Sequence, residues 1–193
     1  MTAALTADER QYRYSTVAII LHWTIAVFVL ANLIIGSFME SLLGDTRIAV
    51  VRVHESFGLT VFVLAWVRLG WRLTHRPPPM PAVYPAWERF LAHLAHIIFY
   101  CLMIGMPIAG WMIISSRYLR PMIIYGMWSL PPFEPINQLP VGPAKAALHD
   151  QLVQLHATGA LIFAGLLVLH VAGALKHQFV DRQRQFARMG IGR

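Results

Sequence analysis

Residues 151–175 read QLVQLHATGALIFAGLLVLHVAGAL, 25 residues without a charged side chain. A membrane-spanning helix needs about 20 such residues, so this stretch predicts a helix that crosses a bilayer. It carries two histidines, His156 and His170, which are 14 residues apart. At about 3.6 residues per turn they lie on nearly the same helix face, roughly 21 Å apart along the axis. One histidine is therefore expected near each boundary of the hydrocarbon core.

Three further apolar stretches precede this one, at residues 17–39, 48–71 and 90–116. The chain is 57% hydrophobic and 13% charged, whereas soluble proteins have about 45–50% apolar and about 25% charged residues. This composition excludes a soluble enzyme and a disordered chain, and the single cysteine, Cys101, excludes a disulfide scaffold. The expected fold class is all-α, an integral membrane four-helix bundle, with residues 1–193 as one transmembrane domain.

The Lys and Arg residues predict the orientation. Eleven of the 16 fall on the side of the two termini and the 72–89 connection, and five fall on the opposite side. Cytoplasmic loops carry the excess of basic residues, so both termini are expected in the cytoplasm. The first stretch is too long for the apolar region of a signal peptide and is expected to stay in the mature protein. The net charge of +7 does not indicate a nucleic-acid partner, because basic residues stand at the ends of apolar segments. We expect residues 117–145, rich in proline, to form an irregular cap with a short interfacial helix.

Two other histidines match His156 and His170 in depth. With alternating helix directions, His22 lies near the cytoplasmic boundary and His54 near the outer boundary. The pairs that this topology allows are His22 with His170, and His54 with His156. Two imidazoles facing each other at each of two depths in a four-helix bundle are what a pair of bis-histidine haems requires. We therefore expect two haem b groups, with these four residues as the axial ligands of the iron.

A second set of residues surrounds these expected sites. Arg52, Arg120 and Lys145 lie on the outer face near the His54/His156 pair. They either neutralise haem propionates and lipid headgroups, or steer a small anionic electron donor toward the protein. His96 lies three residues after His93 near the cytoplasmic start of the third helix. It is a candidate for a contact beside the inner haem, with a structural role as the alternative.

Five segments carry a family resemblance. They are Ile20–Trp23 (ILHW), Val53–Gly58 (VHESFG), Ala92–His96 (AHLAH), Leu155–Thr158 (LHAT) and Leu169–His177 (LHVAGALKH). In this order they resemble the bacterial cytochrome b561 family, from about residue 10 to Gly190. The resemblance implies a multi-pass protein of the bacterial inner membrane with two b-type haems, whose ligands carry over to the four histidines named above. Ala157 departs from the pattern, because similar sequences often have an acidic residue after this ligand.

Bis-histidine haems leave no open coordination position, so outer-sphere electron transfer is the expected chemistry. The resemblance implies a quinone partner, ubiquinone or menaquinone, within the lipid. Some members of the family are superoxide:quinone oxidoreductases, and we expect that activity, superoxide oxidation coupled to ubiquinone reduction, for this chain. One alternative is a haem-bearing membrane anchor that serves a soluble dehydrogenase or hydrogenase as redox partner. A more distant alternative is a histidine-rich metal or proton transporter without haem.

Overall fold

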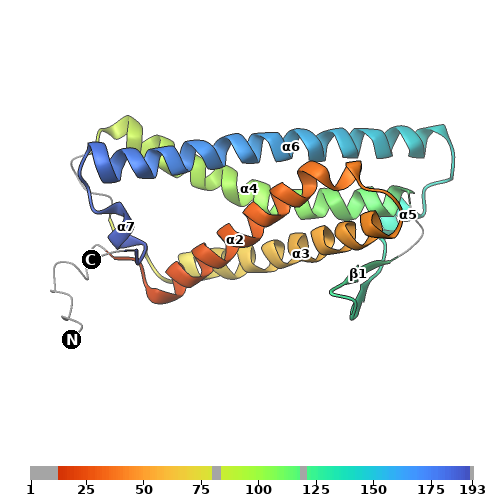
Figure 1. The fold of residues 1–193 in the computed structure, drawn as a ribbon, viewed down its shortest axis with the longest axis horizontal. Coiled ribbons are helices and arrows are strands. Elements are labelled where there is room, and N and C mark those ends of the chain that lie inside the picture. Colours follow the sequence, from red (N-terminus) through yellow and green to blue (C-terminus); the bar gives the residue numbers. More distant parts are fainter. Residues whose placement is uncertain (1–12, 80–83, 118–120, 192–193) are drawn as a thin grey trace.

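A computed structural model describes residues 13–79, 84–117 and 121–191 (Figure 1). Four long helices dominate it: α2 (Thr16–Phe38), α3 (Gly44–Thr74), α4 (Ala86–Arg117) and α6 (Pro143–Leu175). Each is long and apolar enough to cross a membrane, and η2 (Lys176–Val180), one π-helical turn, continues α6. The expectation of an all-α bundle with four membrane-spanning helices is confirmed.

Helices α3, α4 and α6 are longer than the expected spans, because the expectation followed apolar residues, whereas helices continue past a membrane boundary. The largest difference is in α6, which begins at Pro143, eight residues before the charge-free stretch. Proline suits the first turn of a helix, since the N–H that it lacks would have no intrahelical acceptor there. Helix α4 continues through Pro107, as a kinked rather than a broken helix would.

Helix α2 packs on α3, α3 packs on α4, and α4 packs on α6. Helix α6, by contrast, makes few or no close backbone contacts with α2 or α3. The buried core lies at mid-depth, where α2 and α3 meet α4 and α6 around Phe163, which is seven residues from both His156 and His170. The other buried members of this core are Ile25, Val29, Val61, Ala65 and Met103. The core therefore separates the two ends of α6.

The start of α2 and the short helix α7 (Gln185–Arg188) lie at one end of the bundle (Figure 1). The backbone N–H of Tyr14 donates to the carbonyl of Arg188 at 3.2 Å. The indole N–H of Trp23 donates to the carbonyl of Met189 at 3.0 Å. The C-terminal segment is thereby fastened to the beginning of the first helix. We refer to this as the terminal end.

The opposite end carries the connection from α4 to α6, and we refer to it as the hairpin end (Figure 1). Strands β1 (Met122–Ile124) and β2 (Trp128–Leu130) pair antiparallel, with Ile123 opposite Ser129. The turn between them places Tyr125 and Gly126 at φ of 51° and 70°. The expected short helix is present as α5 (Glu134–Asn137), but the hairpin was not expected. A one-turn 3-10 helix, η1 (Met39–Ser41), joins α2 to α3 at this end.

Candidate functional site

The structure brings His22 and His170 together at the terminal end. His22 belongs to α2 and His170 to α6, and their ring centroids are 6.2 Å apart with an angle of 59° between the planes. Trp23 contacts the His22 ring edge-on at 5.1 Å, and Phe99 contacts the His170 ring edge-on at 5.3 Å. Aromatic rings therefore border both imidazoles.

A second pair lies at the hairpin end. His54 of α3 and His156 of α6 have ring centroids 6.1 Å apart. The two pairs thus share α6 and lie on opposite sides of the central core. The structure joins the four histidines in the combinations that the sequence predicted, while their role as haem ligands stays a prediction.

The separation of each pair suits two imidazoles that bind one iron from opposite sides. Each nitrogen would then lie about 2 Å from the metal, which puts the ring centroids roughly 6 Å apart. The Nδ1 atom of His22 is buried and has no hydrogen-bond partner among the described residues. Both pairs also bridge α6 to helices that it hardly touches. The residues present therefore fit a bis-histidine haem at each end.

Two glycines border the pair at the hairpin end. A Cβ added to Gly36 of α2 would lie 3.2 Å from Cε1 of His54, and one added to Gly110 of α4 would lie 3.5 Å from Cε1 of His156. The first distance is tighter than ordinary van der Waals contact, so only a residue without a side chain leaves His54 in place. These glycines keep the space beside both imidazoles open.

His96 lies beside the pair at the terminal end. Its ring is perpendicular to that of His170, with centroids 6.2 Å apart. Its Nδ1 is 2.5 Å from the carbonyl oxygen of Ala92, and because a carbonyl only accepts, Nδ1 carries the proton. His93, one turn earlier, is exposed and makes the same bond to Arg89. His96 is therefore oriented by its own helix and contacts the His22/His170 pair.

Of the three basic residues expected near the His54/His156 pair, the structure describes two, Arg52 and Lys145, which differ in burial. Arg52 is exposed on α3, two residues before His54. Lys145 is buried, and its ammonium donates to the carbonyls of Asn137 at 2.9 Å and Leu139 at 3.3 Å. Lys145 thus caps the C-terminal end of α5, and its ammonium group is directed to these carbonyls rather than to an external anion. Arg120 lies outside the described residues.

Two arginines near the end of α3, Arg68 and Arg72, line a cavity close to the His22/His170 pair. Arg68 follows Val61 and Ala65 by seven and three residues, and both of these are buried core residues. Because Val61 and Ala65 face the core, this helical spacing makes Arg68 an inward-facing cation, which the sequence alone did not indicate.

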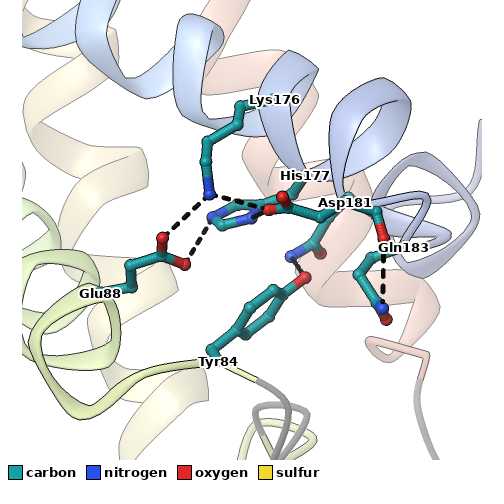
Figure 2. Close-up of polar contacts among 7 residues, drawn as sticks. Tyr84, Glu88, Lys176, His177, Asp181 and Gln183 are labelled. Atoms are coloured by element: carbon teal, nitrogen blue, oxygen red, sulfur yellow. Dashed lines mark hydrogen bonds and ion pairs between the residues drawn. The ribbon is translucent and has the colours of Figure 1, made fainter.

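A polar cluster fastens α4 to the end of α6 at the terminal end (Figure 2). The ammonium of Lys176 donates to Glu88 and to Asp181, at 2.9 Å in each case, and Nδ1 of His177 lies 2.7 Å from Asp181. Ligand atoms of Glu88, His177 and Asp181 lie within 4.8 Å of one another. The Lys176 ammonium already supplies the positive charge between the two carboxylates, so the cluster is a structural clasp.

The clasp shifts the pKa of Asp181. The hydrogen bond from Lys176, followed by that from His177, holds the pKa of Asp181 below its usual value of 3.8. Tyr84 lies next to His177, with ring centroids 4.5 Å apart, and accepts a hydrogen bond from the amide of Gln185 at 3.0 Å. Burial raises the pKa of the Tyr84 phenol above 10.0. No pattern in the sequence links Glu88 to Lys176, which is 88 residues away.

The chain is similar to known proteins over nearly all of its length. A family model described as prokaryotic cytochrome b561 matches residues 13–192. The chain is 27% identical over 186 residues to cytochrome b561 homolog 2 of Escherichia coli K12, covering 92% of this chain and 90% of the relative. It is 25% identical over 181 residues to cytochrome b561 homolog 1 of the same organism, covering 92% and 96%.

A third relative carries a functional name. The probable superoxide oxidase CybB of Yersinia pestis is 28% identical over 180 residues, covering 92% of this chain and 95% of the relative. The family match spans nearly the whole chain and all four long helices. This protein belongs to the prokaryotic cytochrome b561 family, whose members are haem b-binding, multi-pass membrane proteins of electron transfer.

Proposed function

We propose that the chain holds two b-type haems, one between His22 and His170 and one between His54 and His156, and moves single electrons across the membrane. The observation that carries the proposal is the pairing of four imidazoles at 6.2 Å and 6.1 Å, at opposite ends of one helix. Each bound haem would supply reversible one-electron transfer, because two histidine ligands leave no position open for other ligands.

The protein's own residues would hold and insulate the two sites. His156 and His170 fix them roughly 21 Å apart along α6. Phe163 stands midway, packed against Phe99 with ring centroids 5.7 Å apart, in a core of apolar side chains. Such a core excludes water between the sites, so protons and ions have no polar route beside the electrons.

We infer that the terminal end faces the cytoplasm and that the membrane is the bacterial inner membrane. The start of α2 and α7 share one end of the bundle, as an even number of crossings requires. The larger share of Lys and Arg belongs to that end. The His54/His156 pair would then lie toward the periplasm and the His22/His170 pair toward the cytoplasm.

We propose superoxide as the electron donor and ubiquinone as the acceptor. Superoxide loses one electron and becomes oxygen, and ubiquinone takes up two electrons and two protons, so two superoxide ions reduce one quinone. A relative named probable superoxide oxidase supports the donor. Arg52, exposed next to the outer pair, supports electrostatic attraction of a small anion. Menaquinone would serve the same chemistry as acceptor.

The first experiment is a reduced-minus-oxidised spectrum of the purified protein, with haem counted per chain. We expect low-spin b-type bands and two haems per chain. One haem would contradict one of the histidine pairs. A protein without haem would overturn the whole proposal.

The donor is tested separately by stopped-flow measurement of superoxide consumption with a ubiquinone analogue. Arg52→Gln should lower the rate about threefold at low ionic strength, with a smaller difference at high salt, because screening removes the attraction. Arg89→Gln is the matched control, since Arg89 is exposed at the terminal end. Equal rates for Arg52→Gln and the wild type at low salt would reject steering by Arg52. Activity seen only after a soluble redox partner is added would reject superoxide as the donor.

A further inference from the structure

A cavity of about 390 Å³ opens at the terminal end, between the start of α2, the end of α3 and the middle of α4. Four of its lining residues are arginines, and the rest are aromatic, histidine, small or proline residues, with no carboxylate among them. The arginines are Arg13, Arg68, Arg72 and Arg76. A concave site with several convergent cations and no anion of its own is suited to an anionic ligand.

Among the four arginines, Arg68 is the one whose guanidinium group most requires a nearby anion. It follows Ala65, which is fully buried, by one helical turn, and it is itself only partly exposed. No carboxylate within the described ranges forms an ion pair with Arg68 or Arg72. A guanidinium withdrawn from water is costly unless an anion compensates it.

The walls of the cavity are already fixed. The indole N–H of Trp71 donates to the hydroxyl of Ser15 at 3.0 Å, which ties the end of α3 to the start of α2. Trp71 also stacks on His75, with ring centroids 3.6 Å apart. Across the cavity, the Tyr100 hydroxyl is buried and has no hydrogen-bond partner in the described part of the chain. A donor is therefore available in a preformed site, which reduces the entropy that a ligand would lose on binding.

The cavity adjoins the inner histidine pair. Ala18, one helical turn before His22, lines it. Arg68 lies close enough to interact electrostatically with both His22 and His170. Arg68 therefore connects the cavity electrostatically to this histidine pair.

We propose that this cavity binds the two carboxylates of the haem held by His22 and His170, with Arg68 and Arg72 as ionic partners and Tyr100 as a hydrogen-bond donor. The inference rests on the proposed function, because it requires a haem at that pair. Two carboxylates compensate two guanidinium charges, whereas the neutral ring of a quinone would leave Arg68 without a counter-charge. The phosphate of an anionic phospholipid has similar chemistry, so the test separates these two sources of the anion.

The test uses the haem-loaded protein purified as wild type, Arg68→Gln, Arg72→Gln and the control Arg89→Gln. Two readouts do not depend on activity: a spectroscopic redox titration that resolves both haems, and resonance Raman bands of the haem propionates. In Arg68→Gln we expect the midpoint potential of one haem to fall and its propionate bands to shift, with the other haem unchanged. The potential falls because the lost positive charge favoured the reduced haem. Arg72→Gln should give a smaller shift of the same haem.

Lipid analysis of the same samples provides the second arm. Loss of a co-purified anionic phospholipid in Arg68→Gln, with both potentials unchanged, would assign the cavity to a phosphate and overturn the haem-carboxylate proposal. Equal shifts of both haems, or unchanged potentials without lipid loss, would overturn it as well. If Arg68→Gln does not accumulate, Arg68→Lys keeps the charge and should preserve the potential while shifting the propionate bands. Failure of the proposed function is distinguishable, because the wild type would then contain no haem at this pair.

Discussion

The two ends of the bundle hold similar histidine pairs in different surroundings. At the terminal end, an arginine-lined cavity begins one helical turn before His22, at Ala18. At the hairpin end, Gly36 and Gly110 border the His54/His156 pair. Hydroxyl groups of α3 hold the β1–β2 hairpin at this end. The N–H of Tyr125 donates to the Ser56 hydroxyl at 2.9 Å, and the Tyr125 and Thr60 hydroxyls lie 2.6 Å apart.

This difference shows which property controls each site. A site beside several guanidinium groups responds to the loss or gain of charge, because Coulomb interactions are strong where water is excluded. A site bordered by glycines in close contact responds to side-chain size, because a well-packed interior cannot absorb added atoms. We therefore expect charge substitutions to affect mainly the His22/His170 pair and size substitutions to affect mainly the His54/His156 pair.

The largest expected effect comes from removing one ligand of each pair. His170→Ala should lose the haem at the terminal end and His156→Ala the haem at the hairpin end, so that each variant retains about half of the wild-type haem. Haem per chain and redox titration of both variants measure this, and the surviving potential should differ between them. His93→Ala is the control and should keep both haems, because His93 is exposed. Loss of both haems in either single variant would contradict independent sites.

The next effect tests size at the hairpin end. Gly36→Val adds branched carbon atoms where even one Cβ would lie 3.2 Å from His54. We expect a clear loss or spectral shift of the haem at the hairpin end and an unchanged haem at the terminal end, with a destabilisation of about 1–3 kcal/mol from overpacking. Gly105→Val is the matched control, because nothing lies within 4 Å of a Cβ at that position of α4. An equal response of both haems to Gly36→Val would contradict the expectation that side-chain size matters mainly at the hairpin end.

The four spans and the depth pairing of the histidines were predictable because both depend on position along the sequence alone. Charge-free length indicates a span, and the distance of a histidine from the span's end indicates its depth. His22 and His54 could therefore be paired with His170 and His156 before any packing was known. The direction of Arg68 required more, since it depends on which face of α3 points inward, and only the burial of Val61 and Ala65 reveals that face.

Two other features of the structure could not be predicted from the sequence, for different reasons. The hairpin turn places Tyr125 at a φ of 51°, where glycine or asparagine is the usual residue, so the sequence carried only half of the normal turn signal. The Lys176 clasp joins residues of α4 and α6 whose approach depends on how those helices pack. Local patterns cannot indicate contacts that only tertiary packing creates.

A smaller effect concerns the anchoring of the hairpin. The Ser56 hydroxyl donates to the carbonyl of Arg52 at 2.8 Å and accepts the N–H of Tyr125. Ser56→Ala should lower the free energy of unfolding by about 1 kcal/mol, because a partly buried backbone N–H loses its acceptor. Thermal unfolding in detergent measures this, and Ser37→Ala is the control, since the exposed Ser37 hydroxyl bonds only within its own helix. Equal melting temperatures for Ser56→Ala and Ser37→Ala would show that this bond does not hold the hairpin.

The smallest effect comes from the clasp at the terminal end, where charge again decides the outcome. Because Lys176 holds the pKa of Asp181 below 3.8, the folded protein binds fewer protons at this site than the unfolded chain. The stabilisation is therefore complete above pH 3.8 and is lost as the pH falls through the folded pKa. Asp181→Asn should lower Tm by about 1 °C near pH 6, as expected for an exposed ion pair, and the difference should shrink below pH 3.8. Asp150→Asn, exposed at the hairpin end, is the control. A difference that grew as the pH fell would mean that protonated Asp181, not its carboxylate, stabilises this end.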